Sequence, residues 1–286
     1  MGSLKEIKTR IQSVKSTQKI TSAMKMVASA KLRKAQKSIE NLHPYLQGLN
    51  RLLNDFLMSE HDIISFYSQA REVKKVAIVA FSSNTSLCGG FNSSIQKRLS
   101  QTIKSYEGLG SENISIYPVG KKVAKATAKL GFTPAGDFEA MADKPSYVEA
   151  AKLADQLMLL YKNKKIDRVE LVYFHFKSKS TQVLTSETFL PIQFAKPEKG
   201  AIYSDYIVEP DRKEIMTVLI PKVLRLKIFT ALLDSNASEQ AARTMAMQIA
   251  TDNADEILQD LSLLYNKSRQ QAITSELLDI LGGSFK

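Results

Sequence analysis

Few residues of this chain are suited to catalysis or to metal binding. Its only cysteine is Cys88, and its three histidines, His43, His61 and His175, lie far apart in the sequence. One cysteine excludes an internal disulfide and any metal site built on several thiolates, and no zinc-ligand spacing is present. A nucleophilic Cys88 would need a nearby base that the sequence does not place. We therefore predict no catalytic residue, no metal site, and a thiol that is packed or exposed in a turn.

A glycine-bearing loop is the second candidate for chemistry. The apolar run 75–81 (KVAIVAF) is typical of a buried strand, and residues 82–92 then lead into a helix expected over 92–106. A strand-to-helix turn of this kind can bind phosphate. The pair Gly89-Gly90, however, lacks both G-x-G-x-x-G spacing and a G-K-[ST] ending. We predict a tight turn that binds no nucleotide or other cofactor, with Asn92 as the helix cap.

The surrounding segments predict a small α/β domain. Strands are expected over 114–119, 168–176 and 181–192, and helices over 121–130 and 146–163. Ser146 and Glu149 have capping-box spacing, residues 177–180 read as a hairpin turn, and 132–145 as irregular. Strands and helices alternate first and a hairpin follows, which is the order of an α/β domain that ends on an antiparallel pair.

Two long helical seams flank this domain. Steps of three and four residues give an apolar stripe in each, with a polar middle. The C-terminal seam is Met216, Leu219, Val223, Leu226, Thr230, Leu233, Ala237, Gln240, Thr244, Met247, Thr251, Ala254, Leu258, Leu261, Tyr265, Ser268 and Ala272. The N-terminal seam is Leu4, Ile7, Ile11, Val14, Gln18, Thr21, Lys25, Ala28, Leu32, Ala35, Ile39, Leu42, Leu46, Leu49, Leu53 and Phe56.

The seams predict that the two ends of the chain wind around each other. Through the polar middle of the first seam, Ile20, Met24 and Val27 are expected to carry the stripe one residue over, and Pro44 is expected to kink or interrupt the helix. Pro221 is expected to kink the second helix. An antiparallel coiled coil is the simplest arrangement; separate packing of each helix on a globular core is the alternative.

The expected fold is therefore mixed α/β: a long antiparallel coiled coil of the N- and C-terminal helices with an inserted small, Rossmann-like α/β domain. The expected segments are a helix over 1–58, the α/β domain over 74–195, a connector over 196–214 and a helix over 215–286.

Positive charge is concentrated in the first helix. Of the net charge of +11, residues 1–40 carry +8, whereas residues 215–286 carry −1. The outer face of the first helix therefore needs either solvent or an anionic neighbour, such as nucleic acid, anionic lipid or an acidic protein surface. No apolar run approaches the length of a bilayer span.

Particular residues resemble a known family. These are 7–11 (IKTRI), 17–21 (TQKIT) and 23–28 (AMKMVA), the loop 87–92 (LCGGFN), and 237–243 (ASEQAAR), 250–254 (ATDNA) and 265–277 (YNKSRQQAITSEL). They resemble the gamma subunits of F-type ATP synthases across the whole chain. The loop departs from the family's pattern, because Ser86 replaces a glycine and Asn84-Thr85 replace the usual Asp-Arg, so the role of that local pair is open.

The resemblance implies a rotor shaft that couples proton flow to ATP synthesis and is not itself catalytic. Its implied partners are the alpha and beta subunits of the catalytic ring, the epsilon subunit and the ring of c subunits. It also implies a peripheral location on the cytoplasmic side of the cell membrane, through the complex.

The resemblance further implies two sets of contact residues. The contacts with the catalytic ring are Met24, Lys25, Arg243, Arg269, Gln270, Thr274 and Glu276; those at the base, with the c-ring, are Tyr206 and Glu209. The alternative for each is an ordinary exposed polar residue. The apolar C-terminal tip, 277–281, suits either a bearing in the ring or a frayed end.

Two other functions compete with the rotor hypothesis. The basic first helix would suit a coiled-coil nucleic-acid-binding protein, but its basic region has no aromatic stacking platform and no known binding module. An α/β enzyme with helical arms would need several catalytic residues that the fold brings together, and the sequence does not offer such a set.

Overall fold

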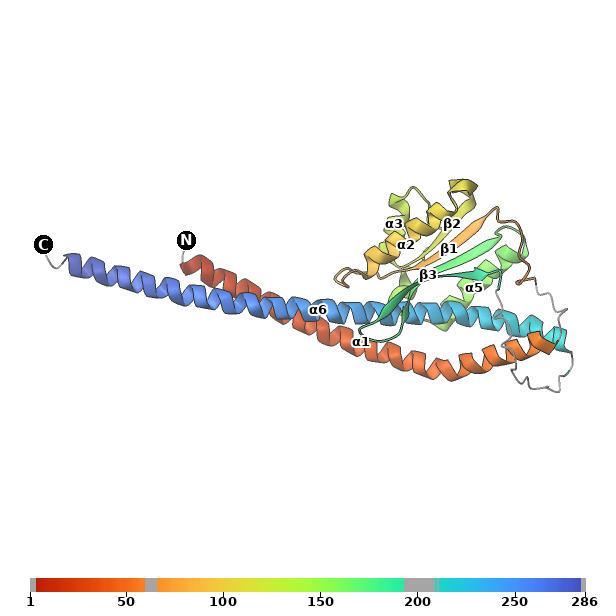
Figure 1. Cartoon of the computed structure of the whole chain (residues 1–286), viewed down its shortest axis with the longest axis horizontal. Coiled ribbons are helices and arrows are strands. Elements are labelled where there is room, and N and C mark those ends of the chain that lie inside the picture. Colours follow the sequence, from red (N-terminus) through yellow and green to blue (C-terminus); the bar gives the residue numbers. More distant parts are fainter. Residues whose placement is uncertain (1–3, 60–65, 193–208, 210, 284–286) are drawn as a thin grey trace. The chain divides into compact units, whose positions relative to one another are not determined.

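The computed structural model describes residues 4–59, 66–192, 209 and 211–283 (Figure 1). Two long helices, α1 (Leu4–Ser59) and α6 (Arg212–Gly283), enclose a small α/β domain in the sequence. The chain divides into two compact units, each considered separately below. Unit 1 comprises Met1–Ala30 and Arg243–Lys286, and unit 2 comprises Lys31–Ala242.

The sheet of unit 2 is mixed and has four strands in the order β2-β1-β3-β4. β1 (Val76–Phe81) pairs in parallel with β2 (Ile114–Val119) and with β3 (Arg168–Phe176). β3 pairs antiparallel with β4 (Gln182–Leu190), which confirms the predicted hairpin.

The helices of the domain are α2 (Phe91–Ser105), α3 (Lys121–Lys129), α4 (Glu139–Asp143) and α5 (Tyr147–Lys162). α4 lies in the segment predicted to be irregular, because five residues are too few to show a helical period. Ser146 is the N-cap residue of α5 as predicted, but its side chain makes no capping hydrogen bond.

The side chains of β1 alternate between two cores, as the pleat requires. Val76, Ile78 and Ala80 pack with residues of α2 and α3. Ala77, Val79 and Phe81 pack with residues of α5 and with those parts of α1 and α6 that belong to unit 2. All six side chains are buried, so β1 is the centre of the domain.

Neither proline interrupts its helix. α1 continues through Pro44 and α6 through Pro221, which excludes the interruption near His43; the kinks expected at Pro44 and Pro221 remain predictions. A proline inside a helix costs about 3 kcal/mol. Seam residues on both sides of Pro44, including Leu42, Leu46 and Leu49, pack on the same core, and their burial offsets that cost.

Tyr106 makes the stability of the domain depend on pH in the alkaline range. Its hydroxyl donates to Glu170 Oε1 at 3.0 Å. Burial and then the charge of Glu170 raise the pKa of Tyr106 to about 12 from 10.0. The folded state therefore favours the neutral phenol, and its stabilisation, complete below pH 10, is lost as the pH rises toward 12.

We expect Tyr106→Phe to reduce the loss of unfolding free energy between about pH 9 and about pH 11, measured by urea unfolding. Tyr147→Phe, at an exposed tyrosine of the same unit, is the control and should leave that loss unchanged. Equal losses in wild type and Tyr106→Phe would contradict the prediction.

Candidate functional site

In unit 1, α1 and α6 are antiparallel. Gln18 Nε2 donates to Asp255 Oδ1 at 2.8 Å, the hydroxyls of Thr21 and Thr251 lie 2.9 Å apart, and Lys25 Nζ donates to Gln248 Oε1 at 2.9 Å. Residue numbers on α6 fall as those on α1 rise, which is the signature of an antiparallel pair. These three contacts form a polar layer in the middle of the coiled coil.

The predicted seam residues of unit 1 face the partner helix. Ile7, Thr21 and Ala28 of α1 are buried, as are Thr244, Met247, Thr251, Ala254 and Leu261 of α6. The predicted shift of the stripe is wrong, because Ile20 is 60% and Val27 58% exposed. The seam keeps its register because Thr21 and Thr251 satisfy each other's hydroxyls across it.

The predicted ring-contact residues fall into two groups that the structure does not bring together. Met24, Lys25 and Arg243 lie near the polar layer, and none of them is fully exposed. Lys25 is bound to Gln248, and Arg243, only 9% exposed, has contacts within the chain. Both cations therefore already have partners within the chain, and that of Lys25 belongs to the coil.

The other group lies at the far end of α6. Arg269, Gln270, Thr274 and Glu276 are all exposed, and the Thr274 hydroxyl donates to the Gln270 carbonyl of its own helix at 2.9 Å. Figure 1 shows this end of α6 continuing past the start of α1. Of the predicted base contacts, Glu209 is exposed and Tyr206 lies outside the described residues.

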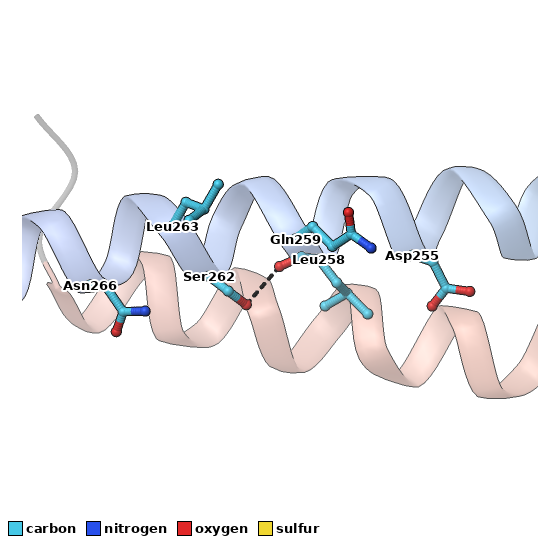
Figure 2. A pocket seen from close by; sticks show the side chains of 6 residues that line it. All are labelled: Asp255, Leu258, Gln259, Ser262, Leu263 and Asn266. Atoms are coloured by element: carbon cyan, nitrogen blue, oxygen red, sulfur yellow. Dashed lines mark hydrogen bonds between the residues drawn. The ribbon is translucent and has the colours of Figure 1, made fainter.

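A shallow groove of about 640 Å³ lies on α6 in unit 1. Figure 2 shows its six lining side chains, Asp255, Leu258, Gln259, Ser262, Leu263 and Asn266. Two of its polar groups are already bonded within the chain: Asp255 accepts from Gln18, and Ser262 donates to the Leu258 carbonyl. Neither group is therefore free to act on a ligand without first giving up its bond within the chain.

The loop between β1 and α2 is a closed turn. The first amides of α3 are bonded by this loop: Lys121 N donates to Asn84 Oδ1, Lys122 N to the Ser83 carbonyl and Val123 N to Ser82 Oγ. These contacts hold the loop against the start of α3. Cys88 is buried, which agrees with a packed thiol.

Asn92 is not the helix cap, contrary to the prediction. α2 begins one residue earlier, after Gly90, and Asn92 turns back into the loop. Its Oδ1 accepts from Ser83 N at 3.2 Å, and its Nδ2 donates to the Thr85 carbonyl at 3.3 Å and lies 3.1 Å from Cys88 Sγ. One amide thus closes the whole turn.

We expect Asn92→Ala to lower the unfolding free energy by about 2 kcal/mol, because the buried Ser83 N–H loses its acceptor. Urea unfolding would measure it. Asn41→Ala, an exposed helical asparagine, controls for the gain in helix propensity and should cost nothing. A similar result for both variants would show that the network does not stabilise the loop.

The described residues show neither a metal-binding group of side chains nor a membrane-spanning helix. There, His, Cys, Asp and Glu form no cluster that could hold a metal ion. Across the same residues, no helix combines the length and hydrophobicity that crossing a bilayer requires.

Comparison with known proteins identifies the family of this chain. The model of the ATP synthase family matches residues 3–285. The chain belongs to this ATP synthase family. It is 60% identical to the ATP synthase gamma chain of Phocaeicola vulgatus and 59% identical to that of Bacteroides fragilis, each over 99% of both chains.

Solved ATP synthase structures share the fold. The rotor chain of Euglena gracilis mitochondrial ATP synthase aligns with 94% of this chain and 98% of its own length, with a TM-score of 0.62 at 17% identity. A central-stalk chain of Tetrahymena thermophila mitochondrial ATP synthase aligns with a TM-score of 0.57 at 23% identity, over 81% of this chain and 99% of its own.

The apolar tip at 277–281 was predicted from the sequence, but the exposed apolar residues that precede it were missed. Ile20, Met26 and Val27 of α1 are more than half exposed. Exposed apolar residues also follow α6 through unit 1: Met245, Ile249, Ile257, Leu263, Leu264, Ile273, Leu277, Leu278, Ile280 and Leu281. Large apolar residues off the seam were the available signal. So much exposed apolar surface is typical of a face that another protein covers.

Proposed function

We propose that this chain is the central-stalk rotor of an F-type ATP synthase and that unit 1 turns inside the catalytic ring. The gamma-chain identity along the whole sequence supports the rotor function. The single structural observation that carries the placement is the coiled coil of unit 1, whose interior is closed by its own seam while large apolar side chains are exposed on its outside. Such a shaft has no ligand of its own to bind and a surface suited to partners.

The proposed mechanism is a bias of conformational equilibria. Two different helices present a different face in each direction, so each beta subunit would meet different contacts at each angle of the shaft. A contact shifts an equilibrium only by the difference in its free energy between the two states. Rotation driven by proton flow would then open and close the catalytic sites in order, and hydrolysis would drive the reverse rotation.

The individual partners follow from the same proposal. We assign the exposed residues Arg269, Gln270, Thr274 and Glu276 of α6 to contacts with the alpha and beta subunits, and Glu209 with Tyr206 to the c-ring base. Met24, Lys25 and Arg243 would also contact the catalytic ring, with Lys25 and Arg243 first released from, or sharing, their contacts within the chain. The epsilon subunit would join the α/β domain.

The division of the chain into segments that end or begin at residues 58, 74, 195 and 214 remains a prediction. So does the location of the chain on the cytoplasmic side of the membrane.

The nucleic-acid alternative has no support among the relatives. Its basis was the charge of the first helix, and one of those cations, Lys25, is bonded inside the coil. A basic face toward acidic loops of a ring fits electrostatic guidance, since rim charges act mainly on encounter and orientation.

The test is rotation in a reconstituted complex with alpha and beta subunits. A bead would be attached through Lys179→Cys in the exposed hairpin turn, in a Cys88→Ser background. ATP should then drive stepwise rotation. A disulfide between Ile249→Cys, which is exposed in the middle of unit 1, and a cysteine on a beta subunit should stop rotation and hydrolysis together.

Reduction of that disulfide in the same sample should restore both activities, which controls for damage by the substitutions. Full hydrolysis with the disulfide intact would contradict the rotor placement, as would failure of the untouched chain to assemble.

A further inference from the structure

Five exposed lysines of unit 2 gather where the parallel strands of the sheet begin, at a surface that we call the amino edge. They are Lys74, Lys75, Lys162, Lys164 and Lys165. Lys75 directly precedes β1, and Lys162 ends α5, from which residues 163–167 lead into β3. Because β1 and β3 are parallel neighbours, both groups of lysines lie at the same end of the sheet.

Hydrogen bonds hold these two segments against each other. Asp167 N donates to the Lys75 carbonyl at 2.8 Å, and Asp167 Oδ2 accepts from Lys74 N at 3.0 Å and from Lys75 N at 2.9 Å. The Arg71 guanidinium pairs with Asp167 Oδ1 at 2.6 Å, donates to the Tyr161 carbonyl at 2.9 Å and lies 4.3 Å from the centre of the Tyr161 ring. The lysines therefore share one well-connected surface.

The amino edge carries more positive charge than its own acids balance. Asp167 is paired with Arg71, and Glu72 lies 3.3 Å from Lys74. In the ranges that the structure describes, the other four lysines form no salt bridge. A group of exposed cations of one sign raises the local potential and attracts an anionic partner.

Two large apolar side chains flank these lysines. Phe66 is 67% and Leu159 59% exposed, and Lys162 Nζ lies 6.0 Å from the centre of the Phe66 ring. Leu159 is three residues before Lys162 in α5, so the two lie on the same face of that helix. Lysines beside exposed apolar groups are typical of surfaces that bind an anionic membrane, because the cations attract the headgroups and the apolar groups enter the boundary with the acyl chains.

The amino edge lies on the side of unit 2 where α6 begins. Lys227 of α6 pairs with Glu187, which lies opposite the middle of β3, whereas Ser238, further along α6, donates to the carbonyl of Phe174 near the end of β3. α6 thus runs in the direction of β3 and starts beside the amino edge. The exposed Glu209, which we assign to the membrane-facing base, directly precedes that start.

We propose that the amino edge is a docking surface for anionic phospholipid headgroups of the membrane that holds the complex. Each lysine close to an anionic membrane surface strengthens binding about fivefold. A fluid lipid surface presents the same charge in every direction, so it can attract a turning domain without favouring any one angle. This inference rests on the proposed rotor function.

The first test uses the soluble complex of this chain with alpha and beta subunits, in which the exposed apolar residues of unit 1 would be covered. Flotation would measure its binding to vesicles of phosphatidylcholine, alone or with added phosphatidylglycerol. The complex should bind the anionic vesicles at about 50 mM salt and much less at about 300 mM, because salt screens exposed charges. Equal binding to neutral and anionic vesicles would overturn the proposal.

Two triple variants of equal net charge decide whether the amino edge is responsible. The test variant combines Lys162→Gln, Lys164→Gln and Lys165→Gln. The control variant removes three exposed cations of α2 and α3 through Lys97→Gln, Lys125→Gln and Lys129→Gln. The test variant should bind anionic vesicles at least about tenfold more weakly than wild type, and the control at most about twofold more weakly. Equal losses would show that only net charge matters and would overturn the assigned surface.

The second test distinguishes lipid from a protein partner in the membrane-embedded complex. A fluorophore would be attached through Lys165→Cys or, as the control, through Lys125→Cys, each in a Cys88→Ser background. With lipids that carry a quencher in the headgroup, the label at 165 should be quenched and the label at 125 should not. Full emission from both labels, as expected if a c subunit covers the amino edge, would overturn lipid docking, as would equal quenching of both. Failure of wild type to assemble or rotate would instead count against the rotor function.

Discussion

Replacing Gly120 with alanine is expected to lower the unfolding free energy of the chain by at least about 3 kcal/mol. Gly120 has a φ of +104°, and a Cβ placed there would lie 2.3 Å from the Ser82 carbonyl oxygen and 2.9 Å from its carbon. Both atoms are backbone at the end of β1, where β1 and its neighbour, the edge strand β2, meet the start of α3. Removing this steric clash therefore requires the backbone of the sheet to move, because the clashing atoms do not belong to a flexible side chain.

Gly131→Ala is the matched control. Gly131 also has a positive φ, +85°, but a Cβ there would have nothing within 4 Å. It should cost only about 1 kcal/mol, from backbone strain alone. Urea unfolding of both variants separates the clash from the strain. Equal losses would show that the domain relaxes around Gly120.

Ala28→Asp is expected to separate the two helices of unit 1 and to abolish ATP-driven rotation. Ala28 is 1% exposed in the seam, so an aspartate there would bury a carboxylate against the facing helix. An unpaired buried charge costs several kcal/mol, which is comparable to the stability of a coil of this size. Loss of protection from hydrogen exchange over 243–261, with protection retained in the α/β domain, would measure the separation.

Ala23→Asp makes the same change on the exposed side of the same helix. It carries the same helix-propensity cost and the same charge, so it should retain both the coil and rotation. Loss of rotation in both variants would mean that charge on α1, and not separation of the helices, is responsible. Retention of the coil in Ala28→Asp would contradict the assigned seam.

Elements defined by a repeating local pattern were predicted well. The apolar steps of three and four placed Ile7, Ala28 and Leu261 in the seam, and all three are buried. The short β-branched runs gave the four strands, and the tight turn at 177–180 gave their hairpin. These patterns succeed because a helix or strand with one buried face repeats its side-chain direction at a fixed period.

Features that depend on a distant partner were predicted poorly. Asn92 has the residue type and position of a cap, but its amide closes the loop back to Ser83. Ile20 and Val27 suggested a rotating stripe, whereas Thr21 and Thr251 fill the seam together. In each case the polar partner comes from elsewhere in the chain, and no local period reports it.

The candidate contact residues show the same division. The sequence alone determined a polar middle in both seams and, by family resemblance, the residues to expect at partner contacts. Only the tertiary structure decided which of them point outward: Arg269 and Glu276 are exposed, Lys25 is bonded to Gln248 across the coil, and Arg243 is buried with a partner within the chain. The physical reason is that a helix's period sets the direction of a side chain relative to its own axis, whereas burial and pairing depend on which other element lies on that side.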